Sequence, residues 1–235
     1  MPADPYPAHP LTPFPPLIIN VALTGIVPTR ERVPHVPLTA EEIVDDAERC
    51  VAAGATILHV HVRDGAGAPE WRRASYAGVI AGLRERCPGA IVCVTTSGRA
   101  GGSVAQRTDV LELDGDLLPD LASLTLGSVN FPSGASVSDI GTIEALAARF
   151  AERGVRPELE IFDLGMAHLA HRLVRRGLLN GPLHANLLLG FPNGAPANAR
   201  SLVALTDALP DEVTSWAAGG FGAYQQSAGA LAVAK

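Results

Sequence analysis

From Leu17 onward, short β-rich runs alternate with longer helical stretches, and this alternation predicts an α/β fold built on a parallel sheet. The predicted strands span residues 17–24, 56–62, 90–96, 120–127, 158–163, 182–189 and 213–217. The predicted helices span residues 39–53, 74–86, 139–153, 166–176, 199–209 and 223–234. Thr39-Ala-Glu-Glu42 has the pattern of a capping box, which supports the start of the first helix.

The residue types on the strands favour a barrel over a dinucleotide-binding sheet. No G-x-G-x-x-G follows the first strand, and no Walker loop is present. Many strands carry aliphatic residues on one face and small or polar residues on the other, as Asn20, Ala22 and Thr24 do in the first. We therefore expect a TIM (β/α)8 barrel. Seven strands are recognisable, six of them followed by a predicted helix, so we expect this chain to lack the eighth strand of such a barrel.

Composition excludes several classes of partner. The net charge of -6 argues against a nucleic-acid partner, which would require a basic face. No apolar run approaches the ~20 residues that span a bilayer, and the start of the chain lacks a secretory pattern. Cys50, Cys87 and Cys93 have no paired spacing and are expected to be free thiols in a reducing cytoplasm.

The N-terminal segment is set apart by its prolines. Residues 1–16 contain prolines at positions 2, 5, 7, 10, 13, 15 and 16, which disfavour helix. We expect an extended arm here, followed by one barrel domain over 17–235. The arm is either disordered or packed on a neighbouring subunit.

The clearest chemical motif is His59-Val-His61-Val-Arg63-Asp64. His59 and His61 lie two residues apart, so both imidazoles project from one face of the second strand, at the end where barrels place their active sites. Two such imidazoles are suited to a Zn²⁺ site, although a catalytic zinc usually has three protein ligands. The alternative is a hydrogen-bonded histidine pair inside the barrel.

Polar groups also follow later strands. Thr96, Ser97 and Gly98 end the third strand, where hydroxyls and backbone N–H groups can hold a carboxylate or an oxyanion; an ordinary turn is the alternative. Ser128 and Asn130 follow the fourth strand, and Asn130 either orients a substrate carbonyl or caps the turn before the next proline.

Other polar residues give weaker indications. Glu158 and Glu160 share a face of the fifth strand and are candidates for a third metal ligand, a base or an ion pair with Arg63. His184 is expected to be a core histidine. The glycines at 219–222 predict a loop after the seventh strand.

These motifs resemble those of the β-keto acid cleavage enzymes, a family of zinc-dependent (β/α)8 barrels. The resemblance covers the chain from Leu17 almost to its end. It rests on the segments 22–25, 34–39, 58–64, 96–99, 122–131, 158–166 and 186–190.

The resemblance implies a reaction in which a β-keto acid and acetyl-CoA yield acetoacetate and a CoA ester. It implies that His59 and His61 bind zinc, that Thr96, Ser97 and Arg63 are catalytic, and that the protein is a homo-oligomer, with a tetramer favoured. The implied substrate-binding residues are Gly98, Ser128, Asn130 and Glu160.

Two departures from the family pattern shape the expectations. Val27 stands where relatives often carry an acidic residue that recognises the far end of the substrate, which argues against an amino-bearing keto acid. The family's third zinc ligand is a glutamate on the eighth strand, which would follow Lys235, so we expect weaker zinc binding and slower turnover without it. There are two alternatives. One is a non-catalytic barrel that binds metal or keto acid, and the other is a metal-dependent hydrolase.

Overall fold

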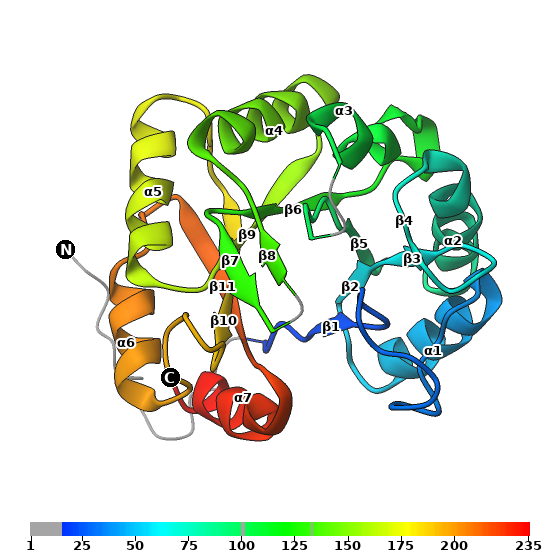
Figure 1. Cartoon of the computed structure of the whole chain (residues 1–235), viewed down its shortest axis with the longest axis horizontal. Coiled ribbons are helices and arrows are strands. Elements are labelled where there is room, and N and C mark those ends of the chain that lie inside the picture. The colour runs from blue at the N-terminus through cyan, green and yellow to red at the C-terminus, as the bar shows by residue number, and fades with distance from the viewer. Residues whose placement is uncertain (1–15, 100–101, 133) are drawn as a thin grey trace.

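Seven parallel strands form the central sheet of the computed structural model, which describes residues 16–99, 102–132 and 134–235. The sheet order is β1-β2-β5-β6-β9-β10-β11, with every neighbouring pair parallel. Figure 1 shows the helices as an outer layer around these strands. The strands are β1 (Asn20–Ala22), β2 (Ile57–Val60), β5 (Ile91–Val94), β6 (Leu121–Thr125), β9 (Arg156–Ile161), β10 (Leu183–Leu189) and β11 (Val213–Gly220).

Six longer helices accompany the strands in the described ranges, and every predicted helix is confirmed in place and type. They are α1 (Ala40–Ala52), α2 (Arg73–Arg86), α4 (Ile140–Arg153), α5 (Leu164–Arg175), α6 (Ala199–Asp207) and α7 (Gln225–Ala234). The capping box at Thr39 and Glu42 is present in both directions. Gly154 ends α4 with φ +69°, a left-handed conformation that suits glycine.

The curvature of the sheet is shown by side chains that meet across its concave face. Glu158 on β9 bonds to His59 on β2 and to Asn20 on β1. These strands are three and four positions away from β9 in the sheet order. In a flat sheet such separations would be about 14–19 Å, at about 4.8 Å per strand. The predicted barrel, with seven strands among the described residues, is therefore confirmed, and β1 and β11 form its edges.

The two faces of the sheet have different chemistry. Residues on the outer face pack against the helices in one large apolar cluster that includes Leu58, Leu124 and Leu159. The inner face holds a small apolar cluster of Ile57, Cys93 and Leu121. Register places His59 beside Cys93, and Ser123 beside Glu158, on this same inner face. The polar residues of the strands therefore face the interior of the barrel.

Two short hairpins and several short helices were missed from the sequence. The hairpins are β3 (Val62–Arg63) with β4 (Pro69–Glu70), and β7 (Val129–Phe131) with β8 (Gly134–Ser136). The segment between β5 and β6 forms α3 (Val104–Arg107), η1 (Asp109–Glu112) and η2 (Gly115–Leu117), and η3 (Gly222–Tyr224) precedes α7. Elements of two to four residues are too short for a periodic pattern to reveal them.

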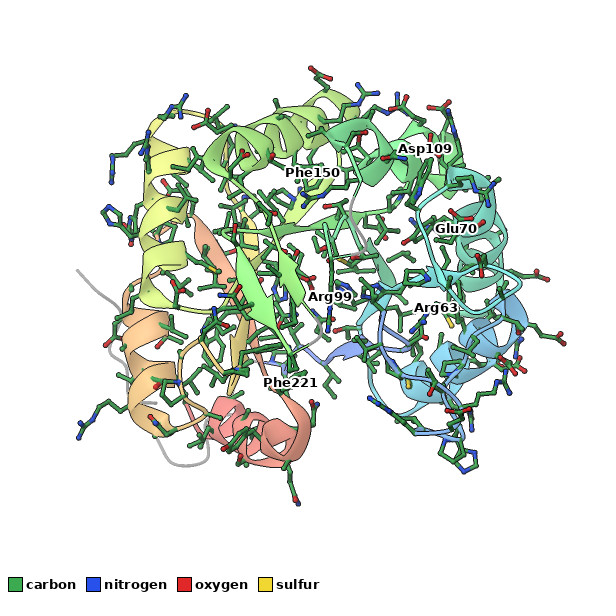
Figure 2. The ribbon with its side chains drawn as sticks, viewed as in Figure 1. Arg63, Glu70, Arg99, Asp109, Phe150 and Phe221 are labelled. Atoms are coloured by element: carbon green, nitrogen blue, oxygen red, sulfur yellow. The ribbon has the colours of Figure 1, made fainter. Side chains whose placement is uncertain are left out.

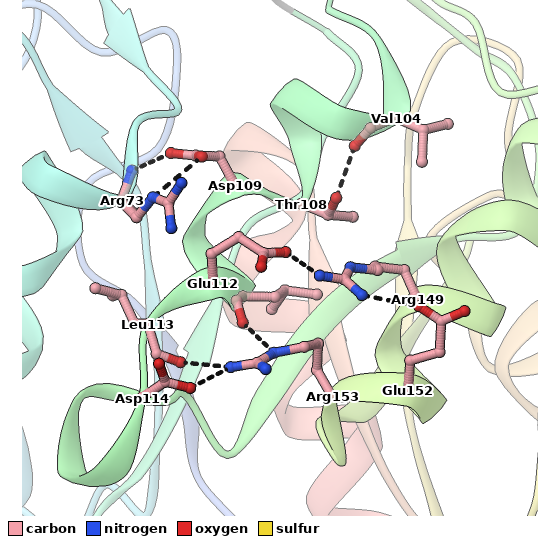
Figure 3. A network of polar contacts seen from close by, with 11 residues as sticks. Arg73, Val104, Thr108, Asp109, Glu112, Leu113, Asp114, Arg149, Glu152 and Arg153 are labelled. Atoms are coloured by element: carbon pink, nitrogen blue, oxygen red, sulfur yellow. Dashed lines mark hydrogen bonds and ion pairs between the residues drawn. The ribbon is translucent and has the colours of Figure 1, made fainter.

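The segment between β5 and β6 forms short helices where a barrel would usually have one long helix. Arginines on α4 hold this segment in position. Arg153 Nε donates to the Leu111 carbonyl at 2.7 Å, and its Nη2 donates to Asp114 at 2.6 Å. Arg149 bridges Glu112 and Glu152 (Figure 3). The segment is therefore attached to the outer layer through backbone carbonyls and carboxylates, which a hydrophobic pattern does not record.

The loop predicted at residues 219–222 requires a correction. Gly219 and Gly220 belong to β11, where they pair with Leu188 and Leu189 of β10. A Cβ at position 220 would collide with the backbone of Tyr224, so glycine allows the chain to turn sharply into η3. The glycines therefore serve a close backbone approach at the strand end.

Residues 1–15 of the predicted arm lie outside the described residues. Within the described ranges, no helix is long and apolar enough to cross a membrane.

Candidate active site

The two histidines of the H-x-H motif lie together at the carboxyl end of β2. Their ring centroids are 5.1 Å apart, with the ring planes inclined by 40°. His59 lies within the strand, and His61 follows its last residue. The sequence prediction that both imidazoles share one face at this end of the barrel is therefore supported by their geometry.

Glu158 fixes the environment of His59. Its Oε2 lies 2.8 Å from His59 Nδ1, and its Oε1 accepts a hydrogen bond from Asn20 Nδ2 at 2.5 Å. Glu158 is fully buried, and burial opposes its ionisation, but His59 and Asn20 outweigh that effect and hold its pKa at about 2. For His59, burial opposes protonation, yet the Glu158 carboxylate outweighs it and raises the pKa of the imidazole.

His61 has the opposite electrostatic setting. Burial, followed by the neighbouring His59, Arg63 and Arg99, holds the pKa of its imidazole well below the usual value. Its Nδ1 is buried and has no hydrogen-bond partner among the described residues. A neutral imidazole with an unpartnered nitrogen is suited to metal ligation, since a metal requires the deprotonated form. His61 therefore fits a zinc ligand by its chemistry as it stands, whereas His59 fits one after it gives up the proton that Glu158 favours, since metal binding releases protons from its ligands.

A second group of potential ligand atoms lies deeper in the barrel. His59, Cys93 and Glu158 each offer one such atom, and these atoms lie within 4.8 Å of one another. Burial, and then the carboxylates of Glu158 and Glu160, raise the pKa of the Cys93 thiol well above its usual value. Because a metal binds the thiolate, this thiol is a poor ligand. The chemistry thus favours the two histidines as the metal-facing pair.

Thr96 anchors the loop after β5. Its hydroxyl donates to the Ser123 carbonyl at 2.5 Å, and its backbone N–H donates to Ser123 Oγ at 3.2 Å. Its own carbonyl accepts from Arg107 Nε at 2.7 Å. The buried Thr96 side chain is therefore engaged within the protein and holds the loop against β6.

Arg107, which the sequence analysis missed, supports this loop from behind. It is buried, and a Cβ added to Gly98 would lie 3.0 Å from its guanidinium. Its two terminal nitrogens lie 3.4 Å from Ser138 Oγ, close to the β7–β8 hairpin. No periodic signal could have identified it, because its role depends on contacts with two segments that are distant from each other in sequence, the Thr96–Gly98 loop and Ser138.

A small cavity of about 40 Å³ lies beside His61 and the loop. Thr95, Thr96, Ser97 and Arg107 contribute to its wall. Ser97 Oγ accepts the backbone N–H of Arg99 at 3.2 Å, so its hydroxyl also stabilises the loop. The predicted Thr96–Gly98 segment and the H-x-H motif are therefore neighbours in space.

Arg63 connects the end of β2 to the loop after β1. Its guanidinium donates to the Gly25 carbonyl at 3.0 and 2.5 Å, to Pro28 at 3.3 Å and to Gly67 at 3.0 Å. These contacts hold the loop that contains Val27, whose side chain is exposed. Figure 2 shows Arg63 and Arg99 inside the ring of helices, whereas Asp109 and Phe150 lie toward its rim.

The remaining predicted residues lie either on the strands of the barrel or at the β7–β8 hairpin. Glu160 lies two residues after Glu158 and accepts the Thr125 hydroxyl at 2.5 Å, and burial raises its pKa. Ser128 and Asn130 are exposed at the β7–β8 hairpin, where Ser128 Oγ accepts the backbone N–H of Ser138 at 3.0 Å. His184 is buried, as expected, and its Nδ1 lies 2.9 Å from Ser215 Oγ.

An aromatic group beyond the carboxyl ends of the strands was also missed. The Arg99 guanidinium lies 3.9 Å from the ring centroid of Phe131. Edge-on contacts link Phe131 with Phe162 and Phe191, and Phe191 lies 4.3 Å from Phe221. These phenylalanines come from four separate segments, one of them strand β7, so the sequence gives no spacing that would identify the group.

Comparison with known proteins connects this geometry to one family. Residues 16–235 match the family model described as beta-keto acid cleavage enzyme. The chain is 36% identical over 218 residues to the 3-keto-5-aminohexanoate cleavage enzyme of Fusobacterium nucleatum, covering 92% of this chain and 78% of that protein. It is 35% identical to the 3-oxoadipate:acetyl-CoA acetyltransferase of Cupriavidus necator, covering 89% and 73%.

Solved structures of ObcA share the fold. The apo structure aligns with a TM-score of 0.72 at 21% identity, over 86% of this chain and 53% of ObcA. A ternary complex of ObcA with a C4-CoA adduct and oxalate aligns with a TM-score of 0.61 at 27% identity, over 67% and 38%. The chain thus spans about half or less of the ObcA chains that it matches.

Proposed function

The chain belongs to the β-keto acid cleavage enzyme family, and we propose that it exchanges acyl groups between a β-keto acid and acetyl-CoA, with zinc as its metal. The C2–C3 bond of the keto acid breaks, and the released acyl group passes to the sulfur of CoA. The thioester C–S bond of acetyl-CoA also breaks, and its acetyl group forms a new carbon–carbon bond to the remaining two-carbon carboxylate unit. The products are acetoacetate and a CoA ester, so all atoms are accounted for.

The observation that carries this proposal is the His59–His61 pair, one imidazole held by a buried carboxylate and the other neutral. Zn²⁺ held there would supply a Lewis acid that polarises the keto oxygen of the substrate. The names of the relatives support the substrates, since one is a 3-oxoadipate:acetyl-CoA acetyltransferase. We place the protein among the acyltransferases on these grounds.

Other residues of the chain bind the substrate or hold the loops around it. The Ser97 hydroxyl and the Gly98 backbone N–H hold the substrate carboxylate, with Arg107 and Ser123 keeping their loop in place. Ser128 and Asn130 contact substrate from the β7–β8 side. Arg63 acts by holding the loop after β1, and Glu160 contacts substrate from the barrel wall.

Acetyl-CoA consumption and zinc content test the proposal together. Purified protein loaded with zinc should convert a β-keto acid and acetyl-CoA to acetoacetate. His59→Ala and His61→Ala should each lower bound zinc and abolish this conversion, whereas Cys93→Ser should retain zinc. Full zinc occupancy in the double histidine variant, measured by elemental analysis, would refute the metal assignment. Keto acid hydrolysis without CoA would indicate the metal-dependent hydrolase instead.

We further propose that the far end of the preferred keto acid is neutral or apolar. Val27, held on its loop by Arg63, offers no carboxylate to a substrate ammonium, so an ammonium brought against it on binding would lose water without gaining a charged partner. A panel of keto acids with acetyl-CoA should show a lower kcat/KM for an amino-substituted acid than for its unsubstituted analogue. The reverse preference would refute this assignment.

The oligomeric state belongs to the same proposal. The family resemblance suggests a homo-oligomer, with a tetramer favoured. Light scattering of the purified protein would determine its mass, and a monomer at all concentrations would exclude this part of the proposal.

A further inference from the structure

Glu158 lies at the centre of a polar connection across the barrel, and we infer that it is a positioning residue for His59. With Asn20, it selects the tautomer and ring orientation of His59 that leave Nε2 available to a metal. The inference rests on the metal role given to His59 under the proposed function. It adds two residues, from β9 and β1, that the sequence motif does not contain.

The geometry leaves His59 one favourable arrangement. Its Nδ1 lies 2.8 Å from Glu158 Oε2, and Glu158 has no exposed surface. Turning the ring over would place a carbon against the carboxylate and leave a buried charge without its partner, which is strongly unfavourable. The imidazole therefore keeps Nδ1–H directed at β9, and Nε2 becomes the nitrogen with a free lone pair once the ring is neutral.

Asn20 fixes the carboxylate itself. Its Nδ2 donates to Oε1 of Glu158 at 2.5 Å, which reserves Oε2 for His59. An amide nitrogen is only a donor, so this contact also fixes which way the Asn20 amide faces. Oε1 of the carboxylate thus bonds to Asn20 on β1, and Oε2 bonds to His59 on β2.

The other interior histidines lack such a carboxylate contact. His61 Nδ1 has no hydrogen-bond partner among the described residues, and His184 Nδ1 meets only the Ser215 hydroxyl. His59 is therefore the ligand whose orientation is set before a metal arrives, and His61 is the one free to adjust. Ser215 supplies a matched control, since it meets a barrel histidine that is not a proposed ligand.

Nitrogen-15 NMR of the metal-free wild-type protein tests the tautomer directly. At a pH where His59 is neutral, its proton should reside on Nδ1, with Nε2 showing the chemical shift of an unprotonated nitrogen. A proton on Nε2 would overturn the inference. This reading needs no variant and therefore does not depend on how substitutions affect folding.

Zinc affinity, measured by competition with a chromophoric chelator, tests the consequence. Glu158→Leu should weaken binding by about 10–100-fold, the range typical for partners of metal-ligating histidines. Glu158→Gln keeps an acceptor for Nδ1–H and should recover part of that loss, while Asn20→Ala should weaken binding less than Glu158→Leu. Ser215→Ala should leave the affinity within about twofold of wild type.

The outcomes separate this inference from the proposed function. If wild type binds zinc, His59→Ala loses it and Glu158→Leu keeps full affinity, the positioning role is wrong and the metal role stands. If His59→Ala keeps full affinity, the metal role fails first. Equal losses in the Leu and Gln variants would show that the charge of Glu158 matters and its acceptor geometry does not, which would also overturn the positioning role.

Discussion

Glu158 and Glu160 lie two residues apart on one face of β9, yet the barrel gives their carboxyl groups opposite properties. Glu158 is ionised because His59 and Asn20 outweigh the cost of burial. Glu160 has the Thr125 hydroxyl as its hydrogen-bond partner, and burial dominates, so its pKa is raised. The alternation of strand residues predicted that both side chains face inward. It could not predict their ionisation, because their partners lie 35 to 138 residues away in sequence.

The raised pKa of Glu160 predicts a pH-dependent effect of Glu160→Gln on stability. The folded state favours the protonated carboxyl, so the associated stability is present below its unfolded pKa of about 4.5 and is lost as pH rises through the folded value. Glutamine is permanently neutral and does not incur this loss. The melting temperature of the variant relative to wild type should therefore rise between pH 4 and pH 8, as followed by circular dichroism. A difference that stays constant over this range would contradict the assignment.

At the scale of the elements, helix starts were predictable where local side-chain chemistry determines them. The pattern at Thr39–Glu42 predicted the start of α1, and the structure contains both hydrogen bonds of the capping box. The segment between β5 and β6 was not predictable in this way. Its short helices are held by Arg149 and Arg153 of α4, and such contacts between distant segments leave no local signal (Figure 3).

Glu42 also predicts acid sensitivity for the start of α1. The Thr39 backbone N–H, then Arg30 and the Leu38 N–H, lower the pKa of Glu42 from 4.5 to about 2. The associated stability is therefore present above about pH 4.5 and is lost as pH falls toward 2. Glu42→Gln should lower the urea midpoint at pH 7, and this deficit should shrink at pH 3. Glu41→Gln is the control, since Glu41 lies in the same first turn and has no part in the capping box; an equal deficit there would contradict the prediction.

For the whole molecule, the sequence predicted the number and order of the strands but not how the barrel is connected across its interior. β1 has three residues and, among the described strands, pairs in the sheet only with β2. Its Asn20 nevertheless reaches Glu158 on β9, and His59 meets the same carboxylate. The buried carboxylate of Glu158 thus connects β9 with β1 and β2. The proposed metal site and the curvature of the barrel therefore depend on the same two hydrogen bonds.

Removing the Asn20 contact should therefore loosen the barrel at β1 first. Asn20→Ala deletes a hydrogen bond to a buried charge and should lower the free energy of unfolding by about 1.5–3 kcal/mol. Thr56→Ala is the matched control, because the Thr56 hydroxyl meets the Ile19 carbonyl of the adjacent segment at 3.4 Å without crossing the barrel; its effect should stay within about 0.5 kcal/mol. In Asn20→Ala, amide hydrogen exchange should accelerate in β1 and β2 and change little in β6, which lies in the middle of the sheet. Uniform acceleration across all strands would mean that the contact contributes only to global stability, and unchanged exchange in β1 would mean that the strand is held by its backbone pairing with β2 alone.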